Sequence, residues 1–154
     1  MEYKTANDVL KAHWDGRLPI NPALIAQDMG IEVKASSPFA VESGHYLYRD
    51  GDPLITYNPS DAPVRRRFTI AHEIAHHVHG DIDAPRDTAE QFNSRSRDPK
   101  EVAANRFAAA LLMPAGLVRH LVVDKRMTDI VKLASTFGVS TAAMEFRLRN
   151  IGLL

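Results

Sequence analysis

Residues 68–76 read Phe68-Thr69-Ile70-Ala71-His72-Glu73-Ile74-Ala75-His76, which places the pattern H-E-x-x-H inside a segment with the apolar spacing of a helix. Apolar residues that recur at intervals of three and four predict a helix from about residue 62 to Gly80. These apolar residues are Phe68, Ala71, Ile74, Ala75 and Val78. Residues four apart on a helix share a face, so both imidazoles can reach one metal ion. Glu73 projects to the side of that face, where it can act on a water molecule at the metal without being a ligand.

A third ligand has to come from another element, because a catalytic zinc site uses three protein ligands and keeps one position open. Asp98-Pro99 predicts the start of a second helix, which ends at Met113-Pro114. On this helix Glu101 shares a face with Asn105 and with alanines that allow the two helices to approach closely. Glu101 is the candidate third ligand, and Asn105 is a candidate partner that hydrogen-bonds a ligand. The alternative is a surface glutamate, which the helix dipole favours in a first turn.

The remaining pattern predicts an α+β fold with a small antiparallel sheet. Helices are expected at residues 5–15 and 22–29, strands at 31–35, 45–49 and 54–57, and a long polar loop at 81–97. Asp50-Gly51 indicates a hairpin between the last two strands. Residues 115–154 read as helical throughout, with breaks near Thr128 and at residues 138–140. We therefore predict a domain over residues 1–114 and a helical subdomain over 115–154.

The composition excludes several classes of protein. The chain has 154 residues, 45% of them hydrophobic and 25% charged, which suits one compact domain with or without a small appendage. Lys and Arg number 19, as do Asp and Glu, so no net charge draws the chain to nucleic acid or an anionic membrane. Cysteine is absent, the first residues contain no apolar signal-peptide core, and no stretch is apolar enough to span a membrane. We expect a cytoplasmic protein.

Two longer motifs carry a resemblance to a known family. H-E-x-x-H followed by a glutamate on the next helix resembles the gluzincin arrangement of zinc peptidases. Ala-His-Glu-Ile-Ala-His-His at 71–77 and Glu-Val-Ala-Ala-Asn-Arg-Phe-Ala-Ala-Ala-Leu-Leu-Met-Pro at 101–114 are similar to the ImmA/IrrE family of metallo-endopeptidases. The early helices, the hairpin and the segment from Leu133 to Leu148 fit the same family, so the resemblance covers most of the chain.

The resemblance implies a zincin-like fold, a metal held by His72, His76 and Glu101, and a catalytic role for Glu73. It implies one Zn²⁺ per chain, although other divalent metals can occupy such ligands. It also implies a protein substrate, namely a helix-turn-helix repressor of the Xre type or an antitoxin. The sequence identifies neither the cleavage site nor the activating signal.

Two further expectations concern substrate binding. The strand at 54–57 directly precedes the metal helix, so we expect Ile55 and Tyr57 to belong to a strand that pairs with an extended substrate. The donor that stabilises the oxyanion is open among four residues of the predicted hairpin: His45, Tyr46, Tyr48 and Tyr57. His77 is expected to point away from the metal, and His79 to serve the end of the helix.

Two other functions remain as alternatives. Residues 133–147 resemble a helix-turn-helix, which raises a metal-stabilised DNA-binding regulator. The beginning of its second helix offers few groups that read bases, so direct DNA binding is the weaker alternative. The other alternative is the toxin component of a toxin–antitoxin pair that acts by forming a complex rather than by cleavage.

Overall fold

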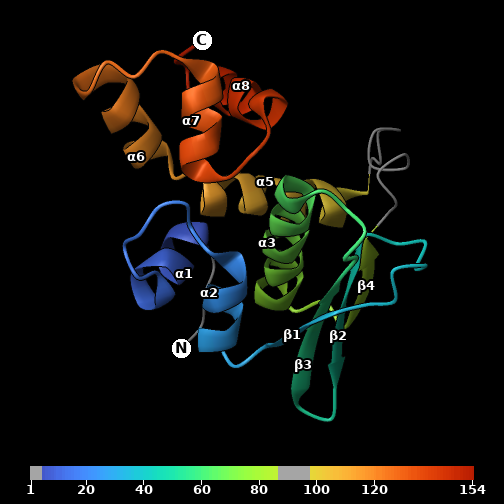
Figure 1. The fold of residues 1–154 in the computed structure, drawn as a ribbon. Coiled ribbons are helices and arrows are strands. Elements are labelled where there is room, and N and C mark those ends of the chain that lie inside the picture. Colours follow the sequence, from blue (N-terminus) through green and yellow to red (C-terminus); the bar gives the residue numbers. More distant parts are fainter. Residues whose placement is uncertain (1–4, 87–97) are drawn as a thin grey trace.

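The computed structural model describes residues 5–86 and 98–154, which form the mixed α+β fold that the sequence predicts (Figure 1). The helices are α1 (Ala6–His13), α2 (Pro22–Asp28), α3 (Pro63–His79), α5 (Pro99–Leu112), α6 (Ala115–Arg119), α7 (Ile130–Phe137) and α8 (Thr141–Asn150), with a π-helical turn η1 (His120–Asp124). The strands are β1 (Glu32–Ala35), β2 (Gly44–Arg49), β3 (Asp52–Tyr57) and β4 (Asp83–Arg86).

The sheet has four strands in the order β1-β3-β2-β4 and is mixed, which corrects the prediction of an antiparallel sheet. β2 and β3 form the expected antiparallel hairpin, closed by Asp50 and Gly51 with φ of 53° and 84°. Positive φ at both positions is the two-residue turn that Asp-Gly favours. β1 pairs with β3 in parallel, because the connection over residues 36–43 carries the chain across before β2 begins.

The long loop predicted at residues 81–97 is partly wrong. Residues 83–86 form β4, which pairs antiparallel with β2 so that Gly44 is opposite Arg86. Polar composition and Pro85 argued against a strand, but a proline is tolerated on an edge strand where its nitrogen faces away from the neighbour. Residues 87–97, the remainder of the predicted loop, lie outside the described residues.

Helix α3 lies between the sheet and the other helices, and its position defines the site (Figure 1). Pro63 occupies its first turn, and Gly80 ends it with a φ of 80°, as predicted. One side of α3 packs on β2 and β3, while α5 packs along another side. Ala104 and Ala108 of α5 are fully buried, which is how the two helices come close together.

The C-terminal helices share one hydrophobic core with the rest of the chain. Phe137 and Met144 are fully buried in the same cluster as residues of α1 and α3. Arg67 of α3 donates a hydrogen bond from Nε to the carbonyl of Gly138 at 3.1 Å, and its guanidinium also contacts the carbonyl of Ile20. Arg147 donates to the carbonyl of Met113 at 2.9 Å. Contacts therefore cross the boundary expected near residue 114, while the helix-turn-helix likeness of α7 and α8 stays a prediction.

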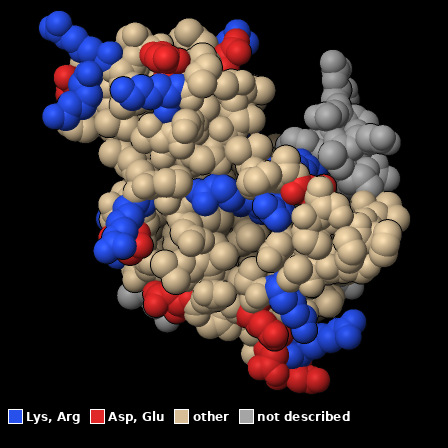
Figure 2. All heavy atoms as spheres, viewed as in Figure 1, with Lys and Arg blue, Asp and Glu red and all other residues tan. Residues whose placement is uncertain are grey.

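Surface charge is mixed on the face shown in Figure 2. Lys and Arg side chains lie next to Asp and Glu at the end of the molecule formed by α6 and at the hairpin end. Across the described part of the chain, no single helix is long and apolar enough to cross a membrane. Two consecutive segments, Pro99–Leu112 and Ala115–Asp124, are long and apolar enough only when taken together, and the chain bends by 49° between them.

Candidate metal centre

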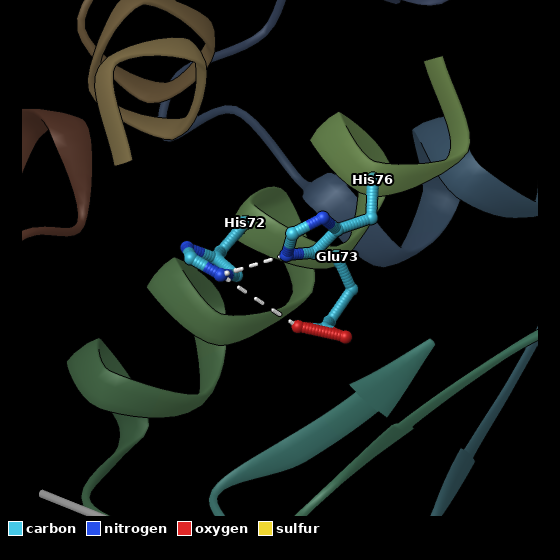
Figure 3. Close-up of side chains that lie close together, drawn as sticks. All are labelled: His72, Glu73 and His76. Atoms are coloured by element: carbon cyan, nitrogen blue, oxygen red, sulfur yellow. Dashed lines mark hydrogen bonds and ion pairs between the residues drawn. The ribbon is translucent and has the colours of Figure 1, made fainter. Parts of the chain in front are cut away.

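The two histidines of the motif meet on the buried face of α3. His72 and Glu73 have no exposed surface, and His76 is 1% exposed. The two Nε2 atoms lie 3.2 Å apart, with the ring planes inclined at 72°, while Glu73 extends toward the sheet (Figure 3). Ligand atoms of His72, Glu73 and His76 all lie within 4.8 Å of one another. The four-residue spacing thus produces the convergence that the sequence predicts.

Glu101 reaches this imidazole pair from the first turn of α5. Its Oε2 lies 2.8 Å from Nε2 of His72, and its Oε1 lies 3.1 Å from Nε2 of His76. The side chain is 19% exposed, so it is not the solvated surface glutamate of the alternative interpretation. One carboxylate therefore faces both imidazoles across the gap between the two helices.

Two carboxylates approach the pair, and distance separates their roles. Two sets of three possible metal ligands therefore share His72 and His76. Glu73 is the third member of one set, and Glu101 is the third member of the other. The nearest Glu73 oxygen is 3.9 Å from Nε2 of His72, whereas Glu101 is about 1 Å closer to the same atom. By distance alone, Glu101 is therefore nearer than Glu73 to the position of a third ligand beside His72.

The three donors suit a divalent metal ion. Ligands 2.0–2.1 Å from a tetrahedral zinc ion lie about 3.3 Å from one another. Here the two Nε2 atoms lie 3.2 Å apart, and each has a different Glu101 oxygen near it, at 2.8 Å from His72 and 3.1 Å from His76. These separations are close to that spacing, so small outward movements of the side chains would admit the ion. Two imidazole nitrogens and one carboxylate are also the donor set of a known class of catalytic zinc site. The residues present therefore fit the metal that their pattern implies.

The Nδ1 atom of each imidazole contacts an oxygen of a neighbouring residue. Nδ1 of His72 lies 2.8 Å from Oδ1 of Asn105, the residue predicted for this role. Nδ1 of His76 lies 2.7 Å from Oδ2 of Asp81, a residue that the sequence interpretation missed. Both acceptors direct the Nδ1 proton away from the site and leave Nε2 for a metal. The signal for Asp81 was its position immediately after the glycine that ends α3.

Electrostatics favours positive charge at the point where the three donors meet. Burial lowers the pKa of His76, but hydrogen bonds to Glu101 and Asp81 and the charge of Glu73 outweigh it and raise the pKa to about 9. Burial raises the pKa of Glu101, but hydrogen bonds from His72 and His76 hold it well below its usual range. Binding of a metal would therefore replace a proton at His76 while the carboxylate of Glu101 stays charged.

Gly44, the first residue of β2, allows α3 to approach the sheet. A Cβ atom at this position would lie 2.4 Å from Cγ2 of Thr69, 2.8 Å from the carbonyl oxygen of Thr56 and 3.8 Å from Cγ of Glu73. The first two distances are shorter than real contacts, and the carbonyl belongs to the neighbouring strand. Glycine at 44 therefore determines how closely the sheet approaches Glu73.

Gly44→Ala is expected to destabilise the fold by about 1–3 kcal/mol, because overpacking forces backbone to move. Thermal unfolding would measure the loss. The control is Gly116→Ala, since an added Cβ there meets no atom within 4 Å. Equal unfolding temperatures for the two variants would show that the contact at Gly44 is relieved without cost.

Three of the four oxyanion candidates have other partners or are exposed, and the fourth, Tyr57, is half-buried at the end of β3. The hydroxyl of Tyr46 lies 2.8 Å from Nδ1 of His77, and its side chain is only 1% exposed. Burial, with Tyr48 and Asp81 nearby, raises the pKa of Tyr46 to about 12, so its hydroxyl keeps its proton while it is hydrogen-bonded to Nδ1 of His77. Tyr48 is 44% exposed, and Nδ1 of His45 lies 3.1 Å from Glu42. None of these contacts places a donor at the imidazole pair.

The substrate-strand role predicted for Ile55 and Tyr57 is wrong. β3 lies between β1 and β2, so its backbone groups are taken up by neighbours on both sides. Ile55 is also fully buried. A strand can add only to a sheet edge, and proximity in sequence to the metal helix did not reveal that β3 is internal.

Comparison with known proteins gives two matches. A family model described as the IrrE N-terminal-like domain, a peptidase family, matches residues 26–149. The chain is 42% identical over 109 residues to a protein of Deinococcus deserti named radiation response metalloprotease IrrE. That match covers 65% of this chain and 39% of the relative, so the chain spans well under half of the relative's length.

Proposed function

The chain belongs to the peptidase family of the IrrE N-terminal-like domain, and on that premise we propose that it is a zinc-dependent endopeptidase. The observation that carries the proposal is the position of Glu101, with one oxygen near each motif imidazole. His72, His76 and Glu101 would hold the metal, and Glu73 would act as general base. The name of the Deinococcus deserti relative supports the metalloprotease class.

A bound divalent cation supplies Lewis acidity, which acidifies water and polarises the scissile carbonyl. Glu73 accepts the proton of the attacking water as it adds to the carbonyl carbon, and it returns that proton to the leaving amine when the C–N bond breaks. The position of Glu73 suits this role, because its carboxylate is buried beside the imidazole pair, 3.9 Å from Nε2 of His72. Zinc is the metal we propose; manganese, iron or cobalt would fit the same ligands.

We place an extended substrate on β4 rather than on β3. Among the described residues β4 has a neighbour only at β2. Its last residue pairs with Gly44, where an added Cβ would lie 3.8 Å from Cγ of Glu73, so a chain added to β4 would pass near the general base. The amide of Tyr48 donates to the carbonyl of Ile82 at 2.9 Å. By alternation along the strand, the backbone groups of Asp83 and Pro85 face the open edge, where Asp83 supplies the N–H.

Asp83→Pro is expected to raise KM for a cleaved protein substrate by about 2- to 10-fold, because one backbone hydrogen bond is lost. Asp83→Ala is the control, since it changes the side chain but keeps the N–H. Steady-state kinetics of both variants would measure the difference. Equal KM values would place the substrate elsewhere.

As substrate we propose a helix-turn-helix repressor of the Xre type or an antitoxin encoded beside this chain, which is what the family resemblance implies. The test incubates the zinc-loaded protein with that purified repressor and analyses the products by mass spectrometry. Cleavage at a defined bond that stops on addition of a chelator is the expected result. A stable complex with an intact repressor would instead favour the toxin-type alternative, and cleavage that persists in chelator would overturn the metal mechanism.

A further inference from the structure

The end of helix α3 folds back onto one of its own histidines. Gly80 is left-handed, the N–H of Asp81 donates to the carbonyl of His76 at 2.9 Å, and the N–H of Gly80 donates to the carbonyl of His77 at 3.3 Å. These two bonds form the Schellman motif, which turns the chain back over the last helical turn. The backbone of Asp81 is therefore fixed beside His76 by the helix ending itself.

This ending delivers a carboxylate to the imidazole. Oδ2 of Asp81 lies 2.7 Å from Nδ1 of His76, and the Asp81 side chain is 13% exposed beside an almost fully buried ring. A carboxylate only accepts hydrogen bonds, so Nδ1 of His76 carries the proton and Nε2 is the atom that faces His72 and Glu101. The contact thus selects the tautomer and limits rotation of the ring.

The second oxygen of Asp81 faces the other helix. Oδ1 lies 3.7 Å from Nζ of Lys100, the residue that precedes Glu101 on α5. Lys100 is 73% exposed, so this ion pair is weak on its own. Its position matters more than its strength, because it joins the turn after α3 to the first turn of α5, where Glu101 lies.

We propose that Asp81 is a positioning residue of the metal site, which orients His76 through Nδ1. The inference rests on the proposed metal site but not on the peptidase reaction. Outer partners of metal-binding histidines raise the basicity of the ligand and fix its orientation. Nothing in the H-E-x-x-H spacing requires this residue, and only the left-handed glycine brings it back to the ring.

The experiment compares Asp81→Ala and Asp81→Asn with the wild-type chain. Zn²⁺ affinity is measured by competition with a chromophoric chelator, and the visible absorption of bound Co²⁺ reports the ligand environment. Asp81→Ala is expected to weaken Zn²⁺ binding by about 10- to 100-fold and to change the Co²⁺ spectrum. Asp81→Asn keeps an oxygen that accepts the Nδ1 proton, so it is expected to restore most of both properties.

The matched control is Asp28→Ala. Asp28 ends α2, and its Oδ2 lies 2.5 Å from Nδ1 of His13, so the variant removes a similar carboxylate–imidazole pair outside the site. This control is expected to keep the Zn²⁺ affinity and the Co²⁺ spectrum of the wild-type chain. That expectation holds even if the substitution lowers the unfolding temperature of the metal-free protein. Wild-type metal binding by Asp81→Ala would overturn the inference.

Failure of the proposed function has a different signature. A wild-type chain that binds Zn²⁺ but cleaves nothing would contradict the peptidase proposal alone, and the Asp81 variants would still decide the inference. A wild-type chain that binds no Zn²⁺ would contradict both.

Discussion

Replacing Glu73 by glutamine is expected to lower the cleavage rate by about 10²- to 10⁴-fold while the metal stays bound, because an amide cannot take a proton from water. Glutamine has nearly the same shape, so it fits the fully buried position beside Gly44. In the proposed site Glu73 is not a ligand, and its nearest oxygen is 3.9 Å from Nε2 of His72. Turnover of the repressor and zinc content per chain are the two measurements.

The control for this prediction is Glu145→Gln on α8, which changes a glutamate paired with Arg149 far along the chain from the motif. It is expected to keep full activity. Unchanged cleavage by Glu73→Gln would show that another group is the base. Loss of zinc together with activity would mean that Glu73, rather than Glu101, is the third ligand.

Glu101→Ala is expected to weaken zinc binding by more than about 100-fold, which exceeds the usual cost of losing a partner of a ligand. The substitution removes the carboxylate that lies beside both Nε2 atoms, and it leaves two imidazoles on one helix. Alanine is a good helix former, so α5 is expected to keep its structure. Competition with a chelator measures the affinity, and circular dichroism checks the helix.

Glu145→Ala serves as the matched control here, because it removes a helical glutamate that pairs with a basic side chain at the surface. Zinc affinity equal to wild type in Glu101→Ala would return Glu101 to the surface-glutamate interpretation. A partial loss, restored by Glu101→Gln, would indicate that the side chain helps to position the histidines rather than to bind metal.

Local patterns predicted the elements well, because short-range physics determines them. The apolar stripe, Pro63 and Gly80 define α3, and Asp50-Gly51 defines the hairpin turn. The four-residue spacing of His72 and His76 brings their rings together without any information from elsewhere in the chain. Long-range pairing was not readable in the same way: the parallel pairing of β1 and the strand β4 depend on which backbone edges meet.

The motif residues, the nature of the metal ligands and the family likeness were thus accessible from the order of amino acids, because each depends on contacts within one helix or on residue type. The tertiary structure decided three other points: that Glu101 lies closer than Glu73 to Nε2 of His72, that Asp81 contacts His76, and that β3 is internal while β4 is an edge among the described strands. These follow from the packing of α3 against α5 and the sheet, and from a left-handed glycine that reverses the chain. Contacts between distant segments form only when the whole core closes, so local spacing does not encode them.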